Sequence, residues 1–312
     1  MGDSLSLPGK QILITGASGF IGAALCKRLV SKDVILHGVS RYRQPETGDI
    51  KWWIGDLTDY HFVETIFNSV KPDIVFHLAS YVSGSRDINI VLSAYHAIAT
   101  TTVNILHAAT VHDAGKIILA GSMEEPKLEN SDIVPGSPYA AAKITGTHYA
   151  KMYHALYGTP VVIPRIFMVY GPNQRDEKKL IPYVINSLLQ DKKLKLSSGV
   201  RSVDWIFVED VVNGLIKMAQ LDGHYGKPID LGSGELVTIK EVVLTIAKLM
   251  EYNDLIEFGD LGDRPLETIN VANTDQTYNL LNWTPDTSLL EGLRITINWY
   301  KERYNNKNRK HH

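Results

Sequence analysis

The sequence has very little cysteine and no long hydrophobic run. Cys26 is the one cysteine among 312 residues, which excludes an intramolecular disulfide and indicates a reducing compartment. It falls within a helical pattern, where a buried apolar role is expected rather than a reactive one. No apolar run approaches the length of a membrane-spanning helix, and Met1–Lys10 lacks the basic start and apolar stretch of a signal peptide. These absences predict a cytoplasmic protein without a membrane partner.

The sequence also lacks an excess of charge of one sign, with 32 Lys and Arg against 34 Asp and Glu. Without a global field to attract nucleic acid, no nucleic-acid partner is expected, and a phosphate-bearing ligand has to be held by local groups. The histidines are scattered, and no spacing of His, Cys and carboxylate residues indicates a metal site. A small-molecule ligand and no bound metal are therefore predicted.

The first half of the chain alternates short apolar runs with amphipathic helical stretches. Strands are predicted at Gln11–Thr15, Val34–Ser40, Ile74–His77, Lys116–Ala120 and Pro160–Arg165. Helices are predicted at Ile21–Ser31, Val63–Val70, Val91–His112 and Tyr139–Tyr157. This order predicts an α/β fold with a doubly wound, parallel Rossmann sheet. Such sheets bind ligands beyond the carboxyl ends of their strands, so we expect one crevice lined by the loops that start at Thr15, Ser40, Leu78, Gly121 and Phe167.

The regular alternation ends after Gly171, where a smaller α/β domain is predicted. A helix is expected from Leu180 to Gln190. The run Asp204–Val208, followed by a helix through Ala219, is expected to return to the main sheet. We therefore predict one domain from residues 1–170 with 203–222, and a second from residues 171–202 with 223–312.

A glycine-containing loop follows the first predicted strand. The segment Gly16–Gly22, GASGFIG, stands where this strand turns into a helix. Glycine permits positive φ and close approach of the backbone to a pyrophosphate, the helix start offers unpaired N–H groups, and the last glycine lets helix and strand pack closely. A dinucleotide fits this context, and a purely structural turn is the alternative. The predicted contacts are Gly16, Ser18, Gly19, Phe20, Ile21 and Gly22.

The second predicted strand ends in Ser40-Arg41, without the acidic residue that accepts from the ribose hydroxyls in NAD enzymes. Arg41 can pair with a 2′-phosphate, and Ser40 can add a hydrogen bond, which favours NADPH over NADH. A solvated Arg41 without a role in specificity is the alternative. Asp56 and Leu57, after the next apolar stretch, are expected beside the adenine.

The segment Ser137–Lys143, SPYAAAK, has the pattern of a helix start, with Ser137 as N-cap and Pro138 at the first position. Tyr139 and Lys143 then lie on one face, a single turn apart. An ammonium beside a phenol favours the phenolate and brings a group with an ordinary pKa near 10 into a working range. By itself this spacing is a common accident on helices.

Ser122 supplies the context for this pair, because it follows the strand predicted at Lys116–Ala120 and shares a sheet edge with the glycine loop. Ser122 would hydrogen-bond a substrate carbonyl or alkoxide, and Tyr139 would exchange the proton. Lys143 would tune Tyr139 and hold the nicotinamide ribose while a hydride moves.

Together these segments resemble the extended short-chain dehydrogenase/reductases over nearly the whole chain. The segments that carry the resemblance are Thr15–Gly22, Asp56–Leu57, His77–Ala79, Ser122, Tyr139–Lys143, Arg165, Tyr170–Pro172 and Asp263–Pro265. The resemblance implies a first domain that binds NADP and a second that binds a sugar nucleotide. It also implies a homodimer, formed by a four-helix bundle from Val91–His112 and Tyr139–Tyr157.

The resemblance further implies contacts with the two ligands. Leu78 and Ala79 are expected at the cofactor, and the substrate contacts are expected at Ser80, Ser122, Lys179, Arg201 and Arg264. Arg264 presents a guanidinium fork to phosphate or ribose. Lys179 belongs to a Lys178-Lys179 run that fits a solvated loop equally well, and Arg201 substitutes for an arginine that many relatives have where this chain has Val203.

Within the family, the segment Gly121–Glu125, GSMEE, is similar to the Gly-Ser-x-Glu-Glu of reductases that act on nucleoside-diphosphate 4-keto-6-deoxyhexoses. Dehydratases often have an acid pair directly after the hydroxyl residue. Here Met123 replaces the first acid, their proton donor for water loss, while Glu124 remains in the position of their base. The resemblance therefore implies NADPH-dependent reduction at C4, with dTDP-4-keto-6-deoxyglucose to dTDP-fucose as the specific expectation.

Two alternatives stay open. A nucleotide-sugar 4-epimerase uses the same three side chains but recycles a tightly held NAD, and Arg41 argues against it. A non-catalytic, dinucleotide-sensing protein would not need Ser122, Tyr139 and Lys143 together. The sequence also leaves open the nucleotide base, the face of C4 that receives hydride, and an accompanying epimerisation.

Overall fold

A computed structural model describes residues 7–46, 48–126, 134–252, 254, 256–262 and 264–309 of the chain. The chain divides into two compact units. Unit 1 comprises Met1–Ile166, Val212–Leu231 and Asp275–Trp283, and unit 2 comprises Phe167–Val211, Gly232–Thr274 and Thr284–His312.

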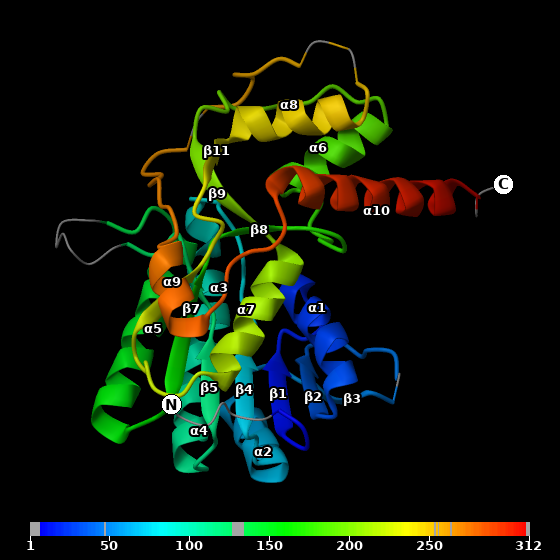
Figure 1. Cartoon of the computed structure of the whole chain (residues 1–312). Coiled ribbons are helices and arrows are strands. Elements are labelled where there is room, and N and C mark those ends of the chain that lie inside the picture. The colour runs from blue at the N-terminus through cyan, green and yellow to red at the C-terminus, as the bar shows by residue number, and fades with distance from the viewer. Residues whose placement is uncertain are drawn as a thin grey trace. The chain divides into compact units, whose positions relative to one another are not determined.

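Unit 1 contains a parallel sheet with the strand order β10-β7-β5-β4-β1-β2-β3, and β6 pairs with β7 beside β5 (Figure 1). Every pairing in this sheet is parallel. The strands are β1 (Gln11–Thr15), β2 (Ile35–Ser40), β3 (Ile50–Ile54), β4 (Ile74–His77), β5 (Lys116–Leu119), β6 (Gly121–Ser122), β7 (Val161–Ile166) and β10 (Pro228–Leu231). The predicted Rossmann sheet is thereby confirmed.

Helices flank this sheet (Figure 1). They are α1 (Phe20–Leu29), α2 (Tyr60–Val70), α3 (Val91–Ala94), α4 (Thr101–Val111), α5 (Pro138–Tyr157), α9 (Thr274–Leu281) and α7 (Val208–Gln220), of which the last two begin in unit 2. The predicted helix Val91–His112 is present, but it contains the π-helical segment η3 (Tyr95–Thr100) between α3 and α4. Two short 3-10 segments, η1 (Val30–Lys32) and η2 (Ile88–Ile90), complete the set of unit 1.

Both faces of the sheet are buried. Leu13 of β1 and Val75 of β4 belong to a core cluster that also takes side chains from α2, α4 and α5. Ile12 and Ile14, which flank Leu13 and point to the opposite face, are equally buried. Cys26 of α1 is also buried, and burial raises the pKa of its thiol to about 12, as expected for an apolar role.

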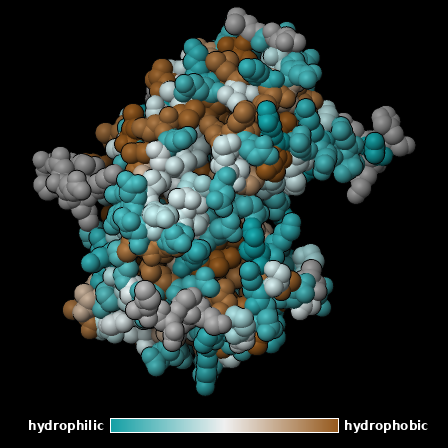
Figure 2. Space-filling view, in the orientation of Figure 1, coloured by the Kyte–Doolittle hydropathy of each residue, from teal (hydrophilic) through white to brown (hydrophobic). Residues whose placement is uncertain are grey.

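Unit 2 contains a three-stranded sheet in the order β11-β9-β8, with β11 antiparallel and β8 parallel to β9. Its strands are β8 (Met168–Tyr170), β9 (Ser202–Phe207) and β11 (Leu236–Thr238), and its helices are α6 (Leu180–Leu189), α8 (Ile239–Leu249) and α10 (Leu289–Arg309). Figure 2 shows that the C-terminal part of α10 is hydrophilic. Among the described helices of both units, none is long and apolar enough to cross a membrane.

The expectation that Asp204–Val208 returns to the main sheet is wrong. These residues belong mostly to β9, which pairs with β8 and β11, whereas β10 occupies the sheet edge beside β7. The predicted boundaries differ accordingly, because residues 167–170 and 203–211 lie in unit 2, while residues 223–231 and 275–283 lie in unit 1. Residues 212–222 lie in unit 1, as predicted. A short apolar run does not specify its pairing partner, which is decided by contacts distant in sequence.

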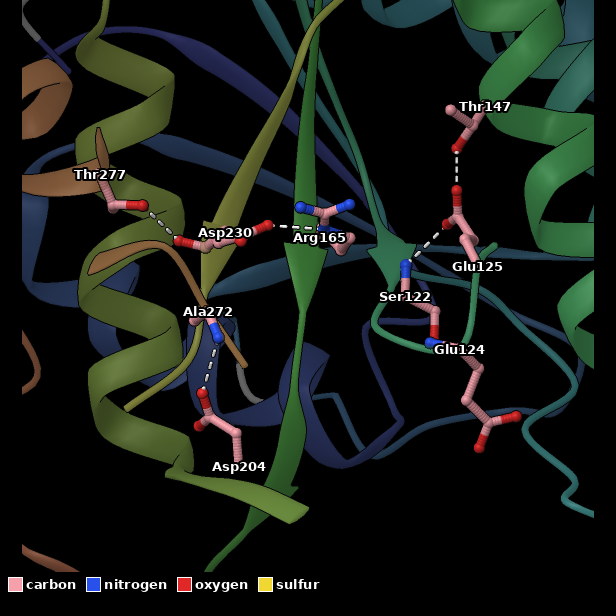
Figure 3. Close-up of polar contacts among 9 residues, drawn as sticks. All are labelled: Ser122, Glu124, Glu125, Thr147, Arg165, Asp204, Asp230, Ala272 and Thr277. Carbon is pink, nitrogen blue, oxygen red and sulfur yellow. Dashed lines mark hydrogen bonds and ion pairs between the residues drawn. The ribbon is translucent and has the colours of Figure 1, made fainter. Parts of the chain in front are cut away.

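Asp204 of β9 fixes the loops of unit 2. Its side chain is completely buried. Oδ1 accepts from the backbone N–H and the hydroxyl of Ser233 at 2.6 and 2.8 Å, and Oδ2 accepts from the N–H groups of Gly234 and Ala272, each at 3.0 Å. Figure 3 shows the contact with Ala272. One carboxylate thus satisfies four donors from two separate segments.

Asp204→Asn should lower the free energy of unfolding by about 3 kcal/mol, because an amide nitrogen replaces an acceptor and leaves buried N–H groups unpaired. Glu235→Gln changes an exposed carboxylate of the same loop and should stay within about 0.5 kcal/mol of the wild type. Urea unfolding of both variants measures the difference. Equal stabilities for the two variants would contradict the assigned role of Asp204.

Candidate active site

The carboxyl ends of β1, β2, β4 and β6 lie at one edge of the parallel sheet, because their strands run in the same direction. Gly16 follows β1, Ser40 ends β2, Leu78 follows β4 and Ser122 ends β6. The structure therefore brings these four predicted loops to one edge. The fifth, at Phe167, follows β7, whose carboxyl end lies at the same edge beside Ser122, and Phe167 is also the first residue of unit 2.

The glycine loop is packed so closely that side chains are excluded. Gly16 has φ +67°, and a Cβ atom there would lie 2.8 Å from the backbone nitrogen of Ala79. A Cβ on Gly22 would lie 2.1 Å from the carbonyl oxygen of Gly16. These contacts hold the loop against Ala79 and against the first turn of α1. Three of the predicted cofactor contacts, Gly16, Gly22 and Ala79, therefore meet at one place.

The start of α1 remains open to an anion. Its N-cap, Gly19, has no side chain to accept from the first N–H groups, and the first turn, which begins with Phe20 and Ile21, contains no acidic residue. These N–H groups and the positive end of the helix dipole suit a diphosphate. The residues present therefore fit the phosphates of a dinucleotide.

The end of β2 forms a polar network that the sequence indicated only in part. The hydroxyl oxygens of Ser18 and Ser40 lie 3.3 Å apart. Gln44, which was not predicted, donates from Nε2 to the Ser40 hydroxyl at 3.1 Å. The guanidinium carbon of Arg41 lies 5.9 Å from the centroid of the Tyr42 ring. Hydroxyl, amide and guanidinium groups are thus gathered beside the glycine loop.

Asp56 and Leu57 lie in the turn after β3. The Asp56 carboxylate accepts from the backbone N–H and the hydroxyl of Thr58, each at 2.9 Å. Leu57 is buried, and its carbonyl accepts from the side chain of Asn104 at 2.8 Å. Both residues therefore stabilise this turn, and their contact with an adenine stays a prediction.

The start of α5 has the predicted geometry. The Ser137 hydroxyl accepts from the N–H of Ala140 at 3.1 Å, and Pro138 occupies the first turn. This cap places Tyr139, which is buried, at the beginning of a helix of 20 residues. The N-cap prediction is thereby confirmed.

Ser122, Tyr139 and Lys143 come together at this helix start. The Ser122 and Tyr139 side chains share a hydrogen bond. The Lys143 ammonium lies 5.9 Å from the centroid of the Tyr139 ring and donates to the carbonyl of Ala120 at 2.7 Å. Three of the four predicted catalytic side chains thus form one cluster at the end of β6.

Burial sets the protonation states in this cluster. The pKa of Tyr139 is raised, first by burial and further by Glu124 and Glu125, while the hydrogen bond from Ser122 lowers it. Burial lowers the pKa of Lys143 to about 8, against the opposing effect of the Glu125 charge. The pKa of Tyr139 is therefore shifted away from the phenolate, opposite to the expectation, because burial disfavours the charged form. At neutral pH Tyr139 keeps its proton, as a proton donor must.

The acidic segment after Ser122 separates into two roles. Glu124, the predicted site residue, is half-buried, and its Oε2 accepts from the Ser137 hydroxyl at 3.5 Å. Met123 is buried, so the position before Glu124 offers an apolar thioether instead of an acid. Glu125 is buried against β6 and α5, and the sequence did not identify it as a site residue (Figure 3). The one feature of the sequence that could have indicated Glu125 is the pair of adjacent acids after a strand.

His77 was also missed as a site residue. Its Nδ1 lies 2.7 Å from the hydroxyl of Thr15, which accepts from the N–H of Ala79 at 3.2 Å. Burial, together with the charge of Lys143, lowers the pKa of His77 to about 3, so the ring is neutral. The chain of contacts joins the end of β1 to the segment Leu78–Ala79, where the cofactor is expected.

The remaining predicted substrate residues lie in both units. In unit 1, the Ser80 hydroxyl is buried and has no hydrogen-bond partner within the described residues. In unit 2, Arg201 pairs with Glu267 at 2.9 Å, which commits part of its guanidinium group. Lys179 is the N-cap of α6, and Arg264 is exposed. Asp263, part of the predicted motif, lies outside the described residues.

In the ranges that the structure describes, no group of three or more His, Cys, Asp and Glu side chains is placed to hold a metal ion.

Residues 12–232 match the NAD dependent epimerase/dehydratase family. The chain is 29% identical to dTDP-glucose 4,6-dehydratase of Haemophilus influenzae, with 93% of this chain and 97% of the relative covered. It is 26% identical to UDP-glucuronate 4-epimerase of Thermodesulfobacterium geofontis, with 93% and 96% covered.

Among solved structures, the chain is similar to the Bordetella bronchiseptica enzyme WbmF in complex with NAD+ and UDP. The TM-score is 0.81 and the identity is 28%, with 96% of this chain and 94% of that chain covered. The similarity in fold therefore spans both units.

Gly22→Ala should lower the free energy of unfolding by about 2 kcal/mol and weaken dinucleotide binding, because its Cβ would meet the Gly16 carbonyl. Gly262→Ala, in open space, should change stability by less than about 0.5 kcal/mol. Thermal unfolding and fluorescence titration with NADPH measure the two effects. A Gly22→Ala protein with wild-type stability and affinity would refute the close-packing argument.

Proposed function

The chain belongs to the NAD-dependent epimerase/dehydratase family of nucleotide-sugar-modifying enzymes, and we propose that it reduces the C4 keto group of a nucleoside-diphosphate 4-keto-6-deoxyhexose with NADPH. The specific reaction proposed is dTDP-4-keto-6-deoxyglucose to dTDP-fucose. The observation that carries the proposal is the buried cluster of Ser122, Tyr139 and Lys143, in which the phenol is protonated at neutral pH.

NADPH, when bound, supplies the hydride to C4 of the sugar. Ser122 and Tyr139 donate hydrogen bonds to the keto oxygen and stabilise the negative charge that develops on it. Tyr139 then transfers its proton to this oxygen, which completes the hydroxyl group. The Lys143 ammonium stabilises the phenolate that remains until Tyr139 regains a proton. The closely packed glycine loop and the open start of α1 would hold the cofactor diphosphate.

Dehydration is the reaction of several relatives, but one side chain argues against it here. Met123 stands where dehydratases often have the acid that protonates the leaving hydroxyl, and this side chain is buried. A thioether cannot donate a proton. Glu124 alone would supply the base without the acid. Net reduction needs neither, because Tyr139 provides the one proton required.

The preference for NADPH is supported by Arg41 at the end of β2. Its guanidinium group is exposed and makes no ion pair within the described part of the chain. The neighbouring Ser40 hydroxyl and Gln44 amide provide further hydrogen-bonding groups for a 2′-phosphate.

A 4-epimerase that recycles NAD is the second candidate. The similarity to UDP-glucuronate 4-epimerase and to WbmF with NAD+ and UDP favours it. It uses the same three side chains, so the consumption of reduced cofactor distinguishes the two activities.

We propose that Lys179, Arg201 and Arg264 of unit 2 bind the nucleoside diphosphate, with Ser80 contacting the sugar. We also propose a homodimer formed by the helix of residues 91–111 and by α5. Both helices expose large apolar side chains, which suit an interface. These are Leu92 and Tyr95 on the first helix, and Leu156 and Tyr157 on the second.

Tyr139→Phe should abolish NADPH oxidation by a 4-keto-6-deoxyhexose nucleotide while NADPH binding stays near wild type, because the ring remains and the proton donor is lost. We expect a loss of about a hundredfold or more in kcat. Tyr149→Phe, an exposed position on the same helix, is the control. The absorbance of reduced nicotinamide measures turnover, and substantial residual turnover in Tyr139→Phe would refute the assignment.

Arg41→Ala should weaken NADPH binding roughly tenfold or more and leave NADH binding nearly unchanged, because the pairing with the 2′-phosphate is lost. Arg43→Ala removes a second exposed arginine three positions after β2 and serves as the control. Fluorescence titrations with both cofactors give the ratio of affinities. An unchanged NADPH/NADH ratio would contradict the role of Arg41.

A further inference from the structure

Glu125 is a buried carboxylate beside the catalytic cluster to which the proposed reaction assigns no task. Only 6% of its surface is exposed. Oε1 accepts a hydrogen bond from the backbone N–H of Ser122 at 2.7 Å, and Oε2 accepts from the Thr147 hydroxyl at 2.7 Å. Figure 3 shows the side chain between the end of β6 and α5. Glu125 therefore connects the residue that carries the catalytic hydroxyl to the helix that carries Tyr139 and Lys143.

The space for this carboxylate depends on Gly121. A Cβ atom on Gly121 would lie 2.9 Å from Glu125 Oε1. An ionised carboxylate is costly to bury, and an apolar side chain could fill the same space without that cost. Burial of an acid at this position therefore indicates that its negative charge has a function.

Lys143 is the cation on which the charge acts. Thr147 lies four residues after Lys143 on α5, so the Glu125 carboxylate and the Lys143 side chain share one face of the helix. Burial lowers the pKa of Lys143, and the Glu125 charge opposes this effect. The amine is thus kept protonated in a place where burial alone favours the neutral form.

The neighbouring titratable groups have other partners or carry no charge. Glu124 is the other acid of the segment, and its charge raises the pKa of Tyr139. His77 of β4 is neutral, with a pKa of about 3 caused by burial and by the Lys143 charge.

The charged side chains on adjacent strands and helices also have other partners. Arg165 of β7 pairs with Asp230 of β10 at 2.6 Å, and buried Lys116 of β5 donates to the carbonyl of Ala219 at 3.0 Å. Of the remaining titratable side chains on elements packed against α5, Tyr95 and His96 of η3 contact each other, and His107 of α4 contacts Tyr153 of α5.

We propose that Glu125 is a positioning residue that couples Ser122 to Lys143, holding the Ser122 backbone against α5 and supplying the counter-charge of the Lys143 ammonium. Without this charge, the amine would lose its proton at a lower pH and could no longer stabilise the Tyr139 phenolate. Only the predicted effect on turnover rests on the proposed function. The titration of Lys143 requires no substrate.

The test is an NMR titration of the whole protein labelled with carbon-13 at the lysine Cε, with the Lys143 signal assigned by its loss in Lys143→Arg. Glu125→Gln removes the charge but keeps the shape of the side chain and one acceptor oxygen. Thr147→Val removes a hydrogen bond but keeps the charge, so it is the matched control. Thermal unfolding of each variant establishes that it is folded.

In Glu125→Gln, the titration midpoint of Lys143 should fall by about one pH unit or more, because an opposite charge shifts a nearby pKa by about that amount. Thr147→Val should leave the midpoint within about 0.3 units, since the charge persists. In turnover assays, activity requires protonated Lys143 and protonated Tyr139, so it is lost as pH rises. The alkaline limb of kcat should therefore move to lower pH in Glu125→Gln only.

An unchanged Lys143 midpoint in Glu125→Gln would overturn the proposal, and so would an equal fall in Thr147→Val. If Glu125→Gln does not fold, Glu125→Asp takes its place: the retained charge should keep the midpoint within about half a unit of wild type, and a larger fall would overturn the proposal. A shifted midpoint together with no turnover on any 4-keto sugar would support the coupling and refute the proposed substrate instead.

Discussion

Parallel pairing of the strands in unit 1 is the constraint on which the site depends. Because β1, β2, β4 and β6 all run in one direction, their carboxyl ends and the loops that follow lie at one edge of the sheet. The backbone of Gly16 can then approach Ala79 closely, and Ser122 can meet the start of α5. Residues more than 100 positions apart along the chain become parts of one site.

Burial gives this site its chemical character. It keeps the proton on Tyr139, removes the charge from His77 and brings the pKa of Lys143 down to about 8. A protonated phenol beside a protonated amine suits delivery of a proton to a developing alkoxide. Because Lys143 is close to losing its proton at neutral pH, the buried charge of Glu125 matters more here than an exposed carboxylate would.

The sequence predicted the parts of the fold that depend on local patterns. Strongly apolar strands and capped helices were located correctly, whereas β3, a half-buried edge strand with Lys51 and two tryptophans, was missed. The partners of β9 were assigned wrongly, because pairing depends on contacts distant in sequence. Glu125 was overlooked for a related reason: acids after strands are usually solvated, and Thr147, which holds its carboxylate, lies 22 positions away.

The central claim is that Tyr139 protonates C4 oxygen while hydride is delivered to C4 carbon in a net reduction. The most direct measurement follows deuterium from NADPH, labelled in turn on each face of nicotinamide C4, to a nucleoside-diphosphate 4-keto-6-deoxyhexose. The account predicts one deuterium at C4 of the product from one of the two labelled cofactors, with one NADPH consumed per product. Formation of an isomer of the substrate or a dehydrated product, with no NADPH consumed, would contradict it.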